Sequence, residues 1–311
     1  MRGALEAKLR LSRGFSLGVL CFGLVGVCAA QSPGLVTILE GDALIVRGAA
    51  RLRAVEGVRL ALGDIVETGN GAFAQIELND QTVLDLGGAA RIMIGSIGAR
   101  YKNERQLYAL AGWFKITNAR KEPNARGFEL RTPLIDVAVL SPVITVLVKP
   151  GEVAVFAERG DVKLAERQAG ASPGLVNVKF GQYYRRAAGV KGTMGATAPP
   201  GFVAEMPRPF RDSLPLRADK FKDREVNARQ APDFAYADVE PWLKAESPFR
   251  RQFVDRWRVK ARDGAFRAAL IANLSSHPEW DPVLFPEKYL PKDPASAASG
   301  AGALRPRAAT P

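Results

Sequence analysis

The sequence predicts a mainly β fold, an antiparallel all-β domain followed by a small α-helical module at the carboxy terminus. Alternating apolar runs, separated by Gly-Asp and Asn-Asp turn signals, follow one another from Leu35 to Tyr184, with the period of two that strands show. Prolines and glycines then crowd the chain, and beyond them apolar residues recur at a spacing of four, which is typical of helices. The expected organisation is a signal peptide at 1–30, a β domain at 31–190, a linker at 191–235, a helical module at 236–291 and a disordered tail at 292–311.

The first thirty residues have the pattern of a secretory signal. A basic start is followed by a run from Phe15 to Val27 that carries no charge, well short of the ~20 residues that a spanning helix needs. The run ends in Cys28-Ala29-Ala30, small residues of the kind that signal peptidase accepts. We expect cleavage after Ala30 and a periplasmic mature protein. An uncleaved anchor is disfavoured by the short run, and lipoprotein processing at Cys28 by the Val27 before it.

Composition limits what the mature chain can be. Both cysteines lie inside the predicted signal, so no disulfide is expected and the fold must be stabilised by packing. The signal carries four basic residues and one acid, so a net charge of +12 falls to about +9 on cleavage. A basic exported protein favours an acidic protein surface, an anionic glycan or a lipid surface as partner, and disfavours nucleic acid. No later apolar run is long enough to span a membrane.

Within the β region, two hairpins can be recognised. Ala74, Ile76 and Leu78 alternate with Gln75, Glu77 and Asn79, which predicts a strand with one buried face and with Glu77 exposed. The run from Val143 to Val148 is apolar on both faces, turns at Pro150-Gly151 and returns as Val153 to Ala157. This pattern predicts a central, covered hairpin.

A later strand and a recurring turn complete the β region. Val176, Val178 and Phe180 are expected to be buried on one face of the last strand. The pairs Gly41-Asp42, Gly63-Asp64 and Gly160-Asp161 each precede a strand. We interpret them as turn devices, because glycine adopts backbone angles closed to other residues and aspartate can accept from a nearby amide. Calcium binding would need several acids in one loop.

The turn pairs lie inside a longer pattern that resembles the FecR domain. Its first half is the segment 58–69 with its Gly-Asp and Thr-Gly, followed by the strands at 71–78 and 82–86. Its second half is Phe128 to Pro133, which leads to Val153 to Phe156. Asn79-Asp80-Gln81 stands where the family usually has Asp-Gly-Ser, and Leu140-Ser141-Pro142 where it usually has Arg-Gly-Thr.

The resemblance implies a periplasmic β domain that, in the best-known members, relays the occupancy of an outer-membrane receptor to a sigma factor. Those members carry an anti-sigma segment and a membrane helix before the domain. Only fourteen residues precede the apolar run here, so we expect a stand-alone relative.

The helical module is expected to carry the one charged surface that the sequence nominates. Asp238 can cap a helix to Ala245, Ser247-Pro248 can start a second helix to about Arg262, and Asp263 can cap a third. Phe249, Phe253 and Trp257 form an apolar stripe on the second helix. Its other face carries the candidate anion-binding residues Arg250, Arg251, Arg258 and Arg262. The alternative is an ordinary solvated face.

The sequence nominates no catalytic, cofactor or metal site. The mature chain has one histidine, His277, and no cysteine, which excludes a structural zinc site of Cys and His ligands. We expect His277 to cap a helix end. Trp242, Trp257 and Trp280 are expected to pack in the core. We therefore predict a non-catalytic binding or sensing module that acts on a protein or an envelope polymer. The alternative is a carbohydrate-acting enzyme, which would need two carboxylates to converge in a cleft.

Overall fold

A computed structural model describes residues 32–95, 106–118, 128–139, 143–167 and 174–290. The predicted signal peptide with its cleavage site at Ala30, the tail at 292–311 and the segment Leu140-Ser141-Pro142 lie outside these residues. Within the described ranges, no helix has both the length and the apolar character needed to cross a membrane.

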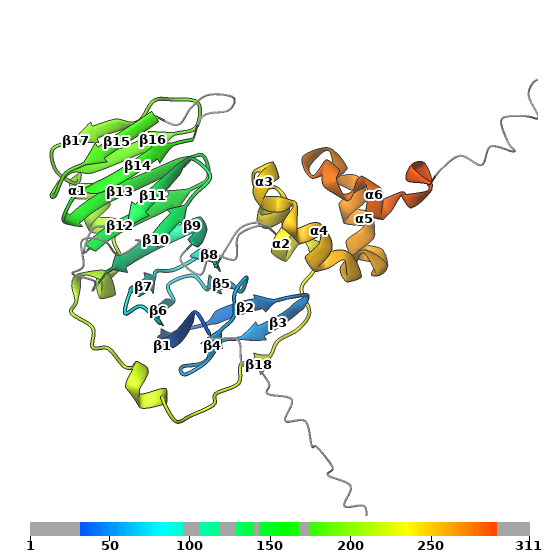
Figure 1. Cartoon of the computed structure of the whole chain (residues 1–311), viewed down its shortest axis with the longest axis horizontal. Coiled ribbons are helices and arrows are strands. Elements are labelled where there is room, and N and C mark those ends of the chain that lie inside the picture. The colour runs from blue at the N-terminus through cyan, green and yellow to red at the C-terminus, as the bar shows by residue number, and fades with distance from the viewer. Residues whose placement is uncertain (1–31, 96–105, 119–127, 140–142, 168–173, 291–311) are drawn as a thin grey trace, which may run out of the picture. The chain divides into compact units, whose positions relative to one another are not determined.

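The β region folds into two sheets that share one long strand, β9 (Gln106–Thr117) (Figure 1). Sheet A contains, in spatial order with β9 at its centre, β4 (Arg59–Leu60), β1 (Gly34–Glu40), β6 (Phe73–Leu78), β7 (Val83–Leu86), β9, β12 (Val143–Lys149), β13 (Glu152–Arg159), β16 (Tyr183–Ala187) and β17 (Thr193–Gly195). Sheet B contains β18 (Arg229–Gln230), β3 (Ala50–Arg53), β2 (Ala43–Arg47), β5 (Ile65–Thr68), β8 (Arg91–Ile94), β9, β10 (Phe128–Arg131), β11 (Ile135–Val139), β14 (Val162–Glu166) and β15 (Gly174–Val178). Neighbouring strands of the described residues are antiparallel except β9 and β10, which are parallel.

Strand β9 passes from one sheet to the other at Gly112. Its first half pairs with β8 and β10 in sheet B, and its second half pairs with β7 and β12 in sheet A. Gly112 has a φ of +104°, and a Cβ there would lie 2.3 Å from the Cα of Ala90. Only glycine fits this crossing.

The main core lies between the two sheets and is built from their inward-facing aliphatic residues. Ile76, Leu84 and Ile116 of sheet A share one buried cluster with Ile92 and Leu107 of sheet B. The hairpin predicted at Val143 to Ala157 is confirmed as β12 and β13, with its turn at 150–151.

The middle part of the predicted linker lies along the outer face of sheet A, whereas its ends contain β17 and β18, which belong to the sheets. We call residues 199–217 the strap; it holds α1 (Pro200–Glu205) and the short turn of helix η1 (Arg208–Arg211), and it is followed by η2 (Ala218–Phe221). Phe202, Met206 and Phe210 are its buried anchors. Phe202 packs against Trp113 and Tyr183 at ring-centroid distances of 4.9 and 5.0 Å.

The helical module packs on the outer face of sheet B. It contains α2 (Tyr236–Leu243), α3 (Ser247–Arg250), α4 (Gln252–Trp257), η3 (Arg258–Arg262), α5 (Gly264–Ala272), η4 (Leu274–Ser276), η5 (Pro278–Trp280), α6 (Asp281–Leu284) and η6 (Pro286–Tyr289). Asp263 caps α5 by accepting from the Phe266 amide at 2.8 Å, as predicted. Asp238 instead lies inside α2, where it accepts from the Ala235 amide.

Aromatic rings dominate the interface between this module and sheet B. Tyr108 of β9 stacks on Phe249 at 3.7 Å with an interplanar angle of 12°. The predicted stripe is confirmed, since Phe249, Phe253 and Trp257 are all fully buried. All three tryptophans of the module are likewise buried, which confirms their expected packing role.

Three further sequence expectations are wrong. Glu77 is only 9% exposed, because η2 and the end of the strap cover the face of β6 that was expected to meet water. Phe180 is 66% exposed, because β15 ends at Val178 and residues 179–181 form the turn that follows. The His277 ring caps no helix. It is fully buried, with its Nε2 3.1 Å from the hydroxyl of Tyr236.

Candidate functional site

A row of polar side chains crosses the outer face of sheet A beneath the strap. Strand register sets the row: Gln75 on β6 faces Asp85 on β7, Asp85 faces Lys115 on β9, and Lys115 faces Thr145 on β12. The polar row consists of Thr37, Gln75, Asp85, Lys115, Thr145 and Glu158. Because side chains alternate along a strand, its members point away from the apolar core that their neighbours build.

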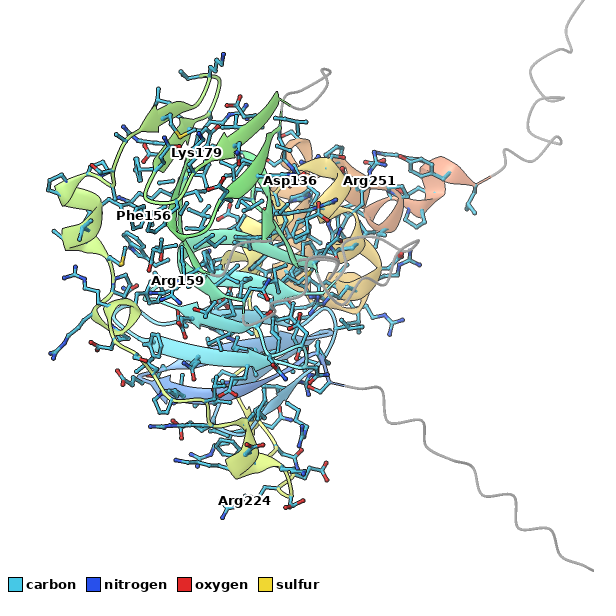
Figure 2. All side chains as sticks on the ribbon, turned by 60° about the vertical axis from the view of Figure 1, so that its left-hand side comes forward. Asp136, Phe156, Arg159, Lys179, Arg224 and Arg251 are labelled. Atoms are coloured by element: carbon cyan, nitrogen blue, oxygen red, sulfur yellow. The ribbon has the colours of Figure 1, made fainter. Side chains whose placement is uncertain are left out.

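A cleft of about 510 Å³ opens between this row and the strap. Asp85, Lys115 and Glu158 belong to its floor, and Ser213 and Leu214 belong to the strap side. Arg159, labelled in Figure 2, also lines the cleft and is exposed. The strap therefore covers the polar row only in part.

The floor of the cleft contains one ion pair whose groups are well satisfied. Lys115 Nζ lies 2.9 Å from Glu158 Oε2 and also donates to the carbonyl of Phe210 in the strap. The hydroxyl of Thr145 donates to Glu158 Oε1. Both oxygens of Glu158 thus accept a hydrogen bond, and Lys115 joins the sheet to the strap.

Asp85 is the exception in the row. Asp85 is only 6% exposed, and its Oδ1 has no hydrogen-bond partner among the described residues. Burial raises the pKa of the Asp85 carboxyl to about 7, although the hydrogen bond from Gln75 and the charge of Lys115 act in the opposite direction. The carboxyl therefore changes charge near neutral pH.

A second carboxylate fixes the end of the strap. Glu77 accepts from the backbone amides of Arg217 and Ala218 at 2.6 and 3.2 Å. With the bond from Lys115 to Phe210, side chains of sheet A hold the backbone of this covering segment at two places. Asp85 lies on the strand between them.

The four arginines that the sequence singled out, Arg250, Arg251, Arg258 and Arg262, differ in how much of each side chain is exposed. Arg250 is held by Glu279 at 2.9 Å and by the carbonyl of Ala245, so it is a structural residue. Arg251 and Arg258 have side chains that are 72% and 64% exposed, and Arg262 is exposed as well. Figure 2 shows Arg251 on the helical module.

Sequence reasoning missed Arg256, which anchors the module to sheet B. Its guanidinium donates to the carbonyls of Val46, Gly48 and Gly63. Burial lowers the pKa of Arg256 to about 10. Its neighbour Trp257 donates to Gly48 as well, at 3.0 Å.

No metal centre is evident in the described part of the chain, where no three His, Cys, Asp or Glu side chains gather in a suitable group. Burial lowers the pKa of His277, which favours the neutral form of the ring. The sequence expectations of no metal and no cofactor stay predictions.

Sequence reasoning also missed the polar row. A signal for it was present: Asp85 lies between Leu84 and Leu86, and Lys115 between Phe114 and Ile116. Charged residues at the outward positions of central strands can mark a second, polar surface. Which strands become neighbours cannot be read from that alternation, so the row emerges only from the register.

Part of the β region matches a known protein family. Residues 64–163 match a family model described as FecR protein. Two solved structures from Parabacteroides distasonis, each described as a "putative anti-sigma factor", are similar at 16% and 15% identity, both with a TM-score of 0.35. In both, the alignment covers 43% of this chain and 59% of the other. No curated protein matches the chain.

Proposed function

We propose that this protein, whose residues 64–163 match the FecR family model, is an exported, non-catalytic binding or sensing module of the cell envelope, acting in the periplasm on a protein or an envelope polymer. The family supports a sensing or signal-transduction role. The observation that carries the proposal is the FecR match over the sheets that hold the polar row and its cleft. The proposed partner surface is the exposed part of the helical module, with Arg251, Arg258 and Arg262.

The arrangement of the carboxylates favours binding over catalysis. Three acids line one cleft, Asp85 and Glu158 on the sheet side and Asp212 on the strap side, and a pair of acids in a cleft is the feature that a carbohydrate-acting enzyme would require. Glu158, however, already accepts hydrogen bonds from Lys115 and Thr145 on its two oxygens. A carboxylate whose two oxygens already accept hydrogen bonds is a poor nucleophile or base. To attack a substrate or take a proton, Glu158 would have to give up the bonds that hold the cleft floor together.

Binding to anionic envelope surfaces tests the proposed partner surface. The mature chain, beginning at Gln31, is mixed with vesicles containing anionic lipid and with anionic glycans across a salt series. We expect association that weakens steeply as salt rises, because exposed charges are screened over ~10 Å at 0.1 M salt. The double variant Arg251→Glu and Arg258→Glu should bind less at every salt concentration.

A matched control is the double variant Lys163→Glu and Lys179→Glu. These lysines are also exposed and give the same change in net charge, but they belong to β14 and the turn after β15. If both double variants lose binding equally, the net charge and not this surface is responsible. Binding that salt leaves unchanged would contradict the proposal.

A mass measurement tests the proposed export. The secreted protein should begin at Gln31 or within a residue or two of it. Recovery of the full-length chain in the membrane fraction would contradict a cleaved signal peptide.

A further inference from the structure

Four strands lie at the edges of the two sheets, and β15 differs from the other three. β4, β17 and β18 have two or three residues each, whereas β15 has five. None of these five is charged or a proline, the pairing with β14 runs without a bulge, and no described strand pairs with the other side of β15. Short strands, charged residues, prolines and bulges normally keep a sheet edge from pairing with another chain. β15 has none of these features.

The direction of the backbone groups of β15 follows from the bonds of its neighbour β14. On the far side of β14, the amide of Arg167 donates to the carbonyl of Leu134, in the register that pairs β14 with β11. Backbone N–H and C=O groups alternate in direction along a strand, so Leu164 and the residues in step with it turn theirs toward β15. Leu164 faces Val176, and Val176 is therefore bonded to β14.

Leu175 and Asn177, on either side of Val176, point their N–H and C=O groups away from β14. No described residue bonds to these backbone groups. Both residues are exposed, and 85% of Leu175 is accessible to solvent. The edge therefore offers an extended strand one donor and one acceptor on each of these residues, in fixed positions.

We propose that β15 pairs with the β15 strand of a second copy of this chain, antiparallel and about a two-fold axis at Val176. In this register, Leu175 of each copy faces Asn177 of the other. Each facing pair exchanges both of its N–H···O bonds, so the outward groups of both strands are all satisfied. The contact is the same on both copies, as a closed dimer requires.

The residues that flank these two exclude the neighbouring registers. A shift toward the start of β15 would bring Pro173 opposite Asn177, and proline has no N–H to donate. A shift the other way would bring Lys179 opposite Leu175. The Lys179 amide, however, donates to Gln182 Oε1, and the Lys179 carbonyl accepts from the Gln182 amide. Only the proposed register uses free groups alone.

The side chains of β15 also fit a copy of the same strand. The strand carries no charge, so antiparallel self-pairing sets no like charges opposite each other. On the inner side, Val176 meets Val176 of the second copy beside the main core, against which it already packs. On the outer side, Leu175 contacts Asn177 of the second copy, which covers part of its exposed apolar surface.

Sedimentation velocity of the full mature chain over a dilution series tests the proposal. The contact is small, so we expect a weak dimer, with an average mass that rises with concentration toward that of two chains. A chain that stays monomeric over the whole series would overturn the proposal. That result is expected if the edge accepts a strand of a different protein instead.

Two double variants test the register. Leu175→Lys with Asn177→Asp sets opposite charges in both facing pairs, whereas Leu175→Lys with Asn177→Lys sets like charges there. We expect the second to dimerise at least about tenfold more weakly than the first, because opposite charges across strands attract and like charges repel. Asn227→Lys with Gln230→Lys adds the same net charge as the second variant at exposed positions outside β15, and its dimerisation should stay within about threefold of the parent chain. Equal dimerisation of the two β15 variants would contradict the proposal.

Amide hydrogen exchange in the unaltered protein gives a test that needs no variant. The amides of Leu175 and Asn177 are free in the monomer, so their exchange should slow as concentration rises, whereas that of Val176 should depend far less on concentration. A mass that rises while these two amides exchange at a constant rate would place the contact elsewhere and refute the pairing. Arg251→Glu with Arg258→Glu should leave sedimentation unchanged, so this outcome is independent of the proposed binding to anionic surfaces.

Discussion

The two sheets present their outer faces to two different kinds of cover. On sheet B, helices bury rings such as Phe249 and Trp242 against Tyr108, and the interface is aromatic. On sheet A, an extended proline-rich strap lies over a polar row, and side chains such as Glu77 bind its backbone. The first cover completes a core, whereas the second leaves a cleft above the sheet and one buried carboxylate oxygen without a donor among the described residues.

The largest expected effect concerns the rings that anchor the two covers. Phe249→Ala should lower the free energy of unfolding by about 3–5 kcal/mol, since it leaves a cavity beside Tyr108. Phe202→Ala is the same change in the strap. It should lower the free energy of unfolding by at least about 1 kcal/mol less than Phe249→Ala does, because Phe202 is less completely buried. Urea unfolding measures both values. Equal losses would mean that the strap is packed as tightly as the helices.

Asp85→Asn should make the molecule more stable at alkaline pH. The folded protein raises the pKa of this carboxyl to about 7 from an ordinary value near 3.8. Between these pH values the folded state holds a proton that the unfolded state has lost, so stability falls as pH rises through this window. We expect the variant to gain on the order of 3 kcal/mol over the parent chain at pH 8 and almost nothing at pH 4. Thermal melts at both pH values check the difference, and a gain of the same size at pH 4 would contradict it.

Glu77→Lys should lower the free energy of unfolding by about 1–3 kcal/mol, because two strap amides lose their acceptor. The control Glu225→Lys makes the same change at an exposed residue and should be nearly neutral. Amide hydrogen exchange at Arg217 and Ala218 should accelerate in the first variant alone. Unaltered exchange at these two amides would show that the strap is held by other contacts.

The smallest effect is expected at the exposed arginines. Replacing Arg251 and Arg258 with Glu should change the free energy of unfolding by less than about 0.5 kcal/mol, since neither side chain packs in the core of the module. Arg256→Glu would serve as the contrasting variant, because its donors hold three carbonyls of sheet B. If the exposed pair proved as sensitive as Arg256, the surface would be structural.

Local pattern was enough to predict much of the fold. The alternation around Ile76 identified the inward face of β6, the two-sided run at Val143 to Val148 identified a covered hairpin, and Asp263 marked a helix start. Each depends on residues close together in the chain, where period and capping chemistry act directly. The Gly-Asp turns were read correctly for the same reason: Gly63 has a φ of +84°, and Asp64 accepts from the Ala61 amide.

The rest depends on contacts between distant residues. Glu77 looks solvent-facing in β6, and only the return of the chain 140 residues later covers it. Phe180 follows Val176 and Val178 at a spacing of two, which predicts a buried position, but β15 ends at Val178. The candidate site needed the order of β6, β7, β9 and β12, which alternation cannot supply, because every amphipathic strand has the same period.

The late return of the chain also orders events in time. Residues Arg229 and Gln230 close the edge of sheet B by pairing with Arg53 and Leu52, and the helices that shield its apolar face come still later. During synthesis from the amino terminus, the apolar outer face of sheet B therefore stays exposed until the helices have been made. Contacts of such long sequence separation slow folding and leave an aggregation-prone intermediate. We expect carboxy-terminal truncations that remove the helices to accumulate as insoluble protein, even though every strand of the main core is present.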